Sequence, residues 1–170
     1  MKLHAFVAMP FGTKPDANGT PIHFDLIYTR LIKPALELAG LDVIRADEED
    51  RAGDIRLDMF QELLMADLVL ADLTIDNPNV WYELGVRHAL RSRGVVLVQG
   101  PRNTNPFDTY TDRKLVYHLS DGAPDPAQLE ADIKKLADMT RATLDAWHER
   151  TVSPVYSLLP NLTEPNWKTL

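Results

Sequence analysis

The stretch Asp67–Leu90, DLVLADLTIDNPNVWYELGVRHAL, decides the fold. Its first part, Leu68–Leu73, is uniformly apolar until Asp72, which is typical of a strand that is buried on both faces. Pro78–Leu90 then predicts a helix with proline in its first turn, where a missing N–H group does no harm. A doubly buried strand followed at once by a helix is the repeating unit of a parallel α/β sheet.

The same alternation extends outward in both directions. Four further segments predict strands: Ala5–Met9, Leu41–Ala46, Gly94–Gln99 and the weaker Lys114–Leu119. Helical spacing of apolar residues predicts helices over Phe24–Ala39 with a kink at Pro34, from Asp54 to about Met65, and from near Pro126. Together these elements predict an α/β protein with a doubly wound, five-stranded parallel sheet of flavodoxin-like order 2-1-3-4-5.

Two segments outside this alternation predict irregular structure. Thr13–Pro21 is rich in Pro, Asn and Gly and is predicted to be a loop. Of the 170 residues, 1–150 predict one α/β domain and 151–170 an extended tail or linker. Because three prolines interrupt it, we expect Ser153–Trp167 to be extended and to pack through Val155, Tyr156 and Leu158.

Composition and motifs exclude several classes of protein. The chain has no Cys, which excludes disulfides and thiolate chemistry, and its formal charge of -7 argues against a partner that is nucleic acid or an anionic membrane. No HxxxH, HExxH, GxGxxG, P-loop or GxSxG pattern occurs, so we expect neither a metal nor a cofactor. We see no signal peptide and no stretch of the ~20 apolar residues that cross a bilayer, and therefore expect a cytoplasmic protein.

The expected binding site lies at one edge of the sheet. In a sheet of this order, ligands bind outside the carboxyl ends of the strands, at the switch point between the first and third strands. This rule selects the loops Met9–Gly12, Asp47–Asp54 and Asp72–Tyr82. Glu83 follows on the next helix beside apolar residues such as Leu84, and burial there would raise its pKa. A lightly solvated carboxylate suits attack on, or electrostatic support of, an anomeric carbon.

Several side chains near this edge have two interpretations. Arg87 lies one helical turn beyond Glu83, either as a surface ion pair or as a clamp for a phosphate or carboxylate. Phe11 is either a core residue or a stacking partner for a base. The acidic run Asp47–Asp50 is either a solvated loop or a group that binds ribose hydroxyls, as acidic residues after a second strand do in dinucleotide folds. The spacing leaves these alternatives open.

The chain also resembles a known family, the nucleoside 2-deoxyribosyltransferase-like superfamily, which includes the nucleoside-monophosphate N-glycosidases. Three ordered motifs carry the resemblance: FVAMPFG at Phe6–Gly12, ADLVLADLT at Ala66–Thr74 and NPNVWYELGVRHAL at Asn77–Leu90. The sequence looks closest to the bacterial branch that heads tetratricopeptide-repeat proteins, which is similar to the sensor region of mammalian apoptosis signal-regulating kinases. The resemblance covers about Phe6–Leu119 and is more specific for the fold than for an activity.

The resemblance implies roles for individual residues. Glu83, the Glu of the ELG motif, would be the nucleophile that attacks C1′ as the base departs. The first-strand loop would contact base and sugar through Met9, Pro10, Phe11 and Gly12. Family enzymes carry an Asp on the preceding helix that assists the leaving base; its position falls at Met59, with Asp58 one residue away and Asp54 at the helix start. Asn77 fits the position of a further family acid or hydroxyl.

Three functions follow as hypotheses. The first is cleavage or transfer of an N-glycosidic bond in a nucleoside, nucleotide or NAD-like molecule, with Glu83 and Asp58 as catalytic residues. The second is a catalytically inactive nucleotide-sensing module of a signalling or defence protein, working as a homo-oligomer or with an attached repeat domain. The third is a purely structural interaction domain. The first two share one predicted set of substrate-binding residues: Met9, Pro10, Phe11, Gly12, Asp47, Asp72, Asn77, Asn79 and Arg87.

Overall fold

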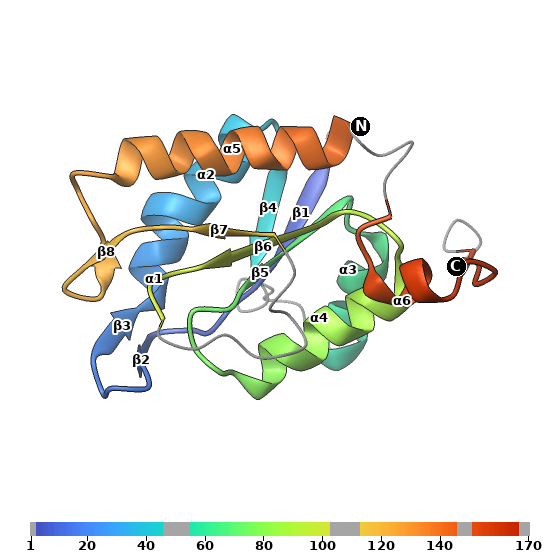
Figure 1. Cartoon of the computed structure of the whole chain (residues 1–170), viewed down its shortest axis with the longest axis horizontal. Coiled ribbons are helices and arrows are strands. Elements are labelled where there is room, and N and C mark those ends of the chain that lie inside the picture. The colour runs from blue at the N-terminus through green and yellow to red at the C-terminus, as the bar shows by residue number, and fades with distance from the viewer. Residues whose placement is uncertain (1–2, 46–54, 103–112, 146–150, 167–170) are drawn as a thin grey trace.

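Five parallel strands form the centre of the molecule (Figure 1). The computed structural model describes residues 3–45, 55–102, 113–145 and 151–166, without the side chains of 55–58. The strands are β1 (His4–Ala8), β4 (Asp42–Arg45), β5 (Leu68–Asp72), β6 (Val95–Gln99) and β7 (Lys114–Val116). They lie in the order β4-β1-β5-β6-β7, which is the predicted order 2-1-3-4-5. The predicted α/β fold with a five-stranded parallel sheet is confirmed.

Helices cover both faces of the sheet, because both sets of alternating strand residues are apolar. On β5, Leu68 and Leu70 belong to a core shared with α1, α2 and α5, whereas Val69 and Ala71 belong to a second core shared with α3 and α4. In Figure 1, α5 lies on one side of the sheet and α4 on the other. The bounds of these helices are α1 Phe24–Ile27, α2 Lys33–Leu38, α3 Ile55–Met65, α4 Pro78–Leu90 and α5 Leu129–Asp145.

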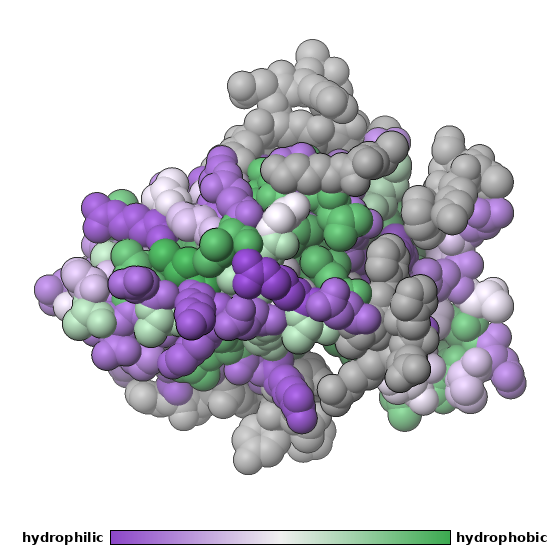
Figure 2. Space-filling view, turned by 90° about the horizontal axis from the view of Figure 1, so that it is seen from above, coloured by the Kyte–Doolittle hydropathy of each residue, from purple (hydrophilic) through white to green (hydrophobic). Residues whose placement is uncertain are grey.

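The outer surface of α5 is polar, as expected for a helix with one buried stripe. Leu136 and Ala137 are buried against the sheet, while Lys134, Lys135 and Asp138 are exposed. Seen from this side, the surface carries many hydrophilic residues with hydrophobic patches between them (Figure 2). The helix therefore closes one core and faces water with its other side.

The parallel register brings the carboxyl ends of β1 and β5 to one edge. Ala8 pairs with Ala71, and Asp72 pairs with Val98 of the neighbouring strand. Met9 and Asp72 consequently lie at the same edge, as predicted. Ala46, the last residue of the predicted strand Leu41–Ala46, lies outside the described residues.

The long helix predicted over Phe24–Ala39 is interrupted by a π-helical turn, η1 (Tyr28–Ile32). The N–H group of Lys33 donates to the carbonyl of Tyr28, five residues back. Pro34 follows immediately and has no N–H group to offer the preceding turn. The helix is therefore irregular just before Pro34, where it forms a wider turn.

Two short hairpins form where the sequence predicted a loop and the end of the fifth strand. The predicted loop Thr13–Pro21 contains β2 (Thr13–Pro15), which pairs with β3 (Pro21–His23), and Asp16 closes the turn by accepting the N–H groups of residues 18 and 20. The predicted fifth strand ends at Val116 rather than Leu119. β8 (Leu119–Ser120) instead pairs with β9 (Ala123–Pro124), because residues 121 and 122 both have positive φ, as a tight hairpin turn requires.

The prediction that the tail is extended from Ser153 is wrong for its first part. Pro154–Leu158 form a short helix, α6. Proline stands at the first helical position, where no N–H group is needed, and the Ser153 hydroxyl caps the helix by accepting the N–H of Val155 at 3.2 Å. Proline forbids helix only in an interior, and the prediction applied that rule at a helix start.

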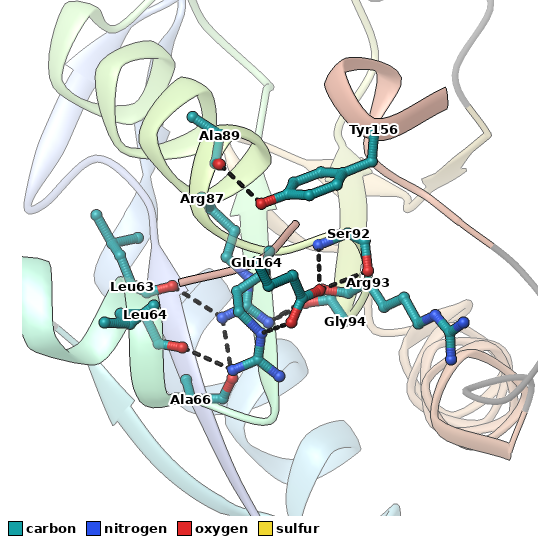
Figure 3. A network of polar contacts seen from close by, with 11 residues as sticks. Leu63, Leu64, Ala66, Arg87, Ala89, Ser92, Arg93, Gly94, Tyr156 and Glu164 are labelled. Atoms are coloured by element: carbon teal, nitrogen blue, oxygen red, sulfur yellow. Dashed lines mark hydrogen bonds and ion pairs between the residues drawn. The ribbon is translucent and has the colours of Figure 1, made fainter. Parts of the chain in front are cut away.

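The tail packs against α4. Tyr156 is buried as predicted and donates from its hydroxyl to the carbonyl of Ala89, and the Ser153 hydroxyl donates to the carbonyl of His88. Glu164 accepts the N–H and hydroxyl of Ser92 at 2.7 and 2.5 Å (Figure 3). Leu158, which was predicted to pack, is 79% exposed.

Arg87, on α4, binds the end of α3 from inside the second core (Figure 3). It has no exposed surface, and its Nη1 donates to the carbonyls of Leu63 and Ala66 at the end of α3. Its Nη2 donates to the carbonyls of Arg93 and Gly94 just before β6. Burial lowers its pKa to about 9. One guanidinium thus satisfies helix-end carbonyls that have no partner within α3 and fixes α4 against α3 and the sheet.

Replacing Arg87 tests this arrangement. Arg87→Met leaves four carbonyls without their donor and should lower the free energy of unfolding by about 3 kcal/mol or more, measured by urea denaturation. Arg30→Met, at an exposed position, is the matched control and should change it by less than about 0.5 kcal/mol. Equal effects of the two substitutions would contradict the structural role of Arg87.

Candidate functional site

The helix α4 begins at the carboxyl edge of the central strand. Asn77 caps it: its side-chain oxygen accepts the N–H groups of Asn79 at 3.0 Å and Val80 at 3.3 Å. Pro78 then occupies the first turn. The predicted binding residues Asn77 and Asn79 are half-buried and exposed, respectively. The cap uses the Asn77 oxygen, and the side-chain NH₂ group takes no part in it.

Glu83 lies on the second turn of α4 and faces inward with Val80 and Leu84. It is only 8% exposed, and no hydrogen bond joins its carboxylate to any residue that the structure describes. Burial therefore raises the pKa of Glu83 to about 7. This burial and the raised pKa were predicted from the apolar neighbours and are confirmed. A buried carboxylate without a hydrogen-bond donor is costly to keep, which marks the position as a candidate for function.

The loop after β1 is held by a cluster around Arg45. Met9 and Pro10 are buried, while Phe11 is 41% exposed and is therefore no core residue. The Arg45 guanidinium lies 5.2 Å from the centre of the Phe11 ring and donates at 2.9 Å to Asp25.

Asp25 also holds Gly12, the residue after Phe11 in this loop. Its carboxylate also accepts the N–H of Gly12 at 3.2 Å, and this bond, helped by Arg45, holds the pKa of Asp25 below its usual range. Gly12 adopts the left-handed conformation, with φ of +65°, which favours glycine. The loop is thus fixed in place and leaves one exposed aromatic ring at the edge.

Asp72 is enclosed rather than open to a ligand. It has no exposed surface; one carboxyl oxygen accepts the N–H of Thr74 at 2.9 Å, and the other lies 2.8 Å from the Tyr117 hydroxyl. Thr74 in turn accepts the N–H of Gly100. Asp72 therefore links the ends of β5, β6 and β7, and the structure gives it no surface for the predicted contact with substrate.

The remaining predicted residues are Arg87, the acidic residues Asp47, Asp54 and Asp58, and the Met59 position. Arg87 shares the face of Glu83, but it is enclosed by carbonyls, so it is neither a surface ion pair nor open to a phosphate. Asp47 and Asp54 lie outside the described residues, and Asp58 is described only by its backbone on the first turn of α3. Met59 is half-buried and packs against the second core.

A cavity of about 590 Å³ lies at the same edge of the sheet. Its walls are the turn between β2 and β3, with Asp16, and the loops that follow β5 and β6, with Thr74, Asp76 and Arg102. Its described lining does not include Glu83. Sequence reasoning missed Arg102, which donates at 2.6 Å to the carbonyl of Leu73 and at 2.9 Å to Asp76. Arg102 lies in the loop that follows the fourth predicted strand. The rule that ligands bind beyond the carboxyl ends of the strands would have selected this loop too, had it been applied to that strand.

Comparison with known proteins adds no identity. No family model and no curated protein matches this chain. Among the described residues there is no group of three or more potential metal ligands, and no described helix has the length and apolarity that a membrane crossing needs. The superfamily resemblance stays a prediction, and the finding that stands is an α/β domain with a five-stranded parallel sheet.

The raised pKa of Glu83 has a consequence for stability. Its pKa rises from an ordinary 4.5 to about 7 on folding, so the folded state binds the proton more tightly and becomes less stable as pH rises from about 4.5 to 7. Glu83→Gln removes this penalty. At pH 8 the variant should be more stable than the wild type by about 3 kcal/mol, and below pH 4.5 the difference should vanish.

Denaturation curves across this pH range measure the effect. Glu37→Gln is the matched control, because Glu37 is exposed on α2 and its substitution should give no such pH dependence. A Glu83→Gln variant less stable than the wild type at pH 8 would show that the carboxylate has a stabilising partner.

Proposed function

We propose that this domain binds a nucleoside or nucleotide and cleaves or transfers its N-glycosidic bond, with Glu83 as the nucleophile. The observation that carries the proposal is the Glu83 carboxylate itself. It is buried, joined by no hydrogen bond to the described residues, and placed on the second turn of a helix that starts at the carboxyl edge of the central strand. A structural carboxylate in the same position would be expected to have donors around it.

The chemistry follows from this environment. A Glu83 carboxylate oxygen attacks C1′ of the sugar, the bond between C1′ and the base nitrogen breaks, and the base leaves with the electron pair and takes up a proton. Water or a second base then attacks the glycosyl ester and releases Glu83. Because few water dipoles screen this carboxylate, it stabilises positive charge on the sugar strongly in the oxocarbenium-like transition state.

The remaining roles are assigned by position. The exposed ring of Phe11 would stack on the base, with Met9, Pro10 and Gly12 as the wall behind it. Asn77 and Asn79 would hold sugar hydroxyls, as would Asp47. Asp58 would protonate the leaving base. We leave Asp72 and Arg87 out of the binding set, since both are enclosed by protein groups.

One observation favours the second candidate, a sensing module without chemistry. Met59 stands where the resemblance implies the Asp that assists the leaving base, and it packs against the apolar core that contains Val80 and Leu84. Without a group that protonates the base, the same site would bind its ligand and signal occupancy to a second copy or an attached repeat domain.

A panel of nucleosides, nucleotides and NAD, with released base read by chromatography, tests the proposal. The wild type should release base from at least one compound, and Glu83→Gln should lower the rate by about 10²–10³-fold or more, because it removes the charge that stabilises the transition state. The wild-type rate should fall about tenfold per pH unit below pH 7, where Glu83 becomes protonated.

Glu37→Gln again serves as control and should leave the rate unchanged. Ligand binding without base release, altered by Glu83→Gln, supports the sensing module. If a compound binds or reacts equally well in both proteins, Glu83 has no role in either function.

A further inference from the structure

Three buried side chains at the carboxyl edge form a closed ring of short contacts. The Asp72 Oδ1 atom lies 2.5 Å from Thr74 Oγ1, Thr74 Oγ1 lies 2.7 Å from the Tyr117 hydroxyl oxygen, and that oxygen lies 2.8 Å from Asp72 Oδ2. None of the three residues is more than 3% exposed. All three separations are those of O–H···O hydrogen bonds.

Counting protons shows what the ring needs. Each of the three contacts requires one proton, and the hydroxyls of Thr74 and Tyr117 supply only two. If Asp72 were ionised, both hydroxyls would donate to it. The two hydroxyl oxygens would then lie 2.7 Å apart, in a buried place, with no proton between them.

We propose that Asp72 carries a proton in the folded protein and closes the ring as a donor. Its Oδ2–H donates to the Tyr117 oxygen, the Tyr117 hydroxyl donates to Thr74 Oγ1, and the Thr74 hydroxyl donates to Asp72 Oδ1. Two backbone groups complete the set: the N–H of Thr74 donates to Oδ1 at 2.9 Å and that of Gly100 to Oγ1 at 2.8 Å. Each oxygen then accepts no more hydrogen bonds than it has lone pairs.

The surroundings of the ring favour the neutral acid. Burial raises the pKa of Asp72. Burial also raises the pKa of Tyr117, the titratable side chain whose hydroxyl lies 2.8 Å from Asp72 Oδ2. On this face of the sheet the apolar core supplies the other neighbours.

Charged side chains on the packed elements have partners elsewhere. Asp25 on α1 pairs with Arg45, and Asp132 on α5 pairs with His118. Arg102, after β6, donates to the carbonyl of Leu73 and to Asp76. None of these charged groups contributes to the shift in the pKa of Asp72.

The ring positions the edge of the sheet. It ties the end of β5 to β7 and, through Gly100, to the end of β6. Thr74 lines the 590 Å³ cavity and stands three residues before the cap of α4. Asp72 is thus a positioning residue in its protonated form, and this role holds whether or not Glu83 acts on a glycosidic bond.

Asp72→Asn distinguishes the two protonation states. The amide offers the same acceptor and donor as the neutral acid, so the variant should fold, and its unfolding equilibrium constant at pH 7 should stay within about tenfold of the wild type. An ionised Asp72 would lose charge-assisted bonds on substitution, which would change that constant by more than about tenfold. A variant that fails to fold would equally overturn the proposal.

Infrared spectroscopy reads the proton itself. The wild type at pH 7 should show a carboxylic-acid C=O band that is absent from Asp72→Asn, and any band of Glu83 cancels because both proteins contain that residue. Tyr117→Phe removes the acceptor of the Asp72 proton, so the band should persist and shift to higher frequency. Absence of the band in the wild type, or a band unmoved in Tyr117→Phe, overturns the proposal.

Discussion

The burial of one guanidinium is the constraint on which the second half of this domain depends. Arg87 has no exposed surface and donates to carbonyls at the end of α3 and before β6. Removing a charge from water is costly unless hydrogen-bond acceptors meet it, so both segments must present their carbonyls to the two Nη atoms in one arrangement, while the Nε has no acceptor among the described residues. Gly94 has φ of +70°, and a Cβ atom there would lie 2.3 Å from the Asp67 carbonyl oxygen and 2.8 Å from the Arg87 guanidinium, so this close approach requires glycine.

The rigidity that Arg87 confers bears on Glu83, one helical turn away on the same face of α4. Arg87 finds its partners in backbone carbonyls, whereas Glu83 has no hydrogen-bond partner among the described residues and a pKa raised to about 7. A helix held firmly at its carboxyl-terminal half can keep an unfavourable carboxylate buried near its start. The carboxyl edge is fixed independently by the Asp72 ring and by the Asn77 cap.

Most of the fold was predictable because its determinants are local. Strands such as β5 are apolar on both faces, and α4 has proline and a capping residue at its start. The burial of Glu83 was likewise predictable from its neighbours. The role of Arg87 was not, because two of its four partner carbonyls lie 21 and 24 residues earlier, at the end of another helix. The enclosure of Asp72 depends on Tyr117, 45 residues later. No local pattern encodes such contacts. The tail helix α6 was missed because proline was treated as a helix breaker, although Pro154 stands at the first helical position, where proline is favourable.

Glu83 is a buried carboxylate, and its burial raises its pKa to about 7. The most direct measurement is an NMR titration of the side-chain carboxyl carbons of glutamate, with the Glu83 resonance assigned by its absence in Glu83→Gln. A midpoint near pH 7 is predicted. A midpoint near 4.5, the ordinary value, would mean that Glu83 is solvated or paired, and would contradict the account of the site.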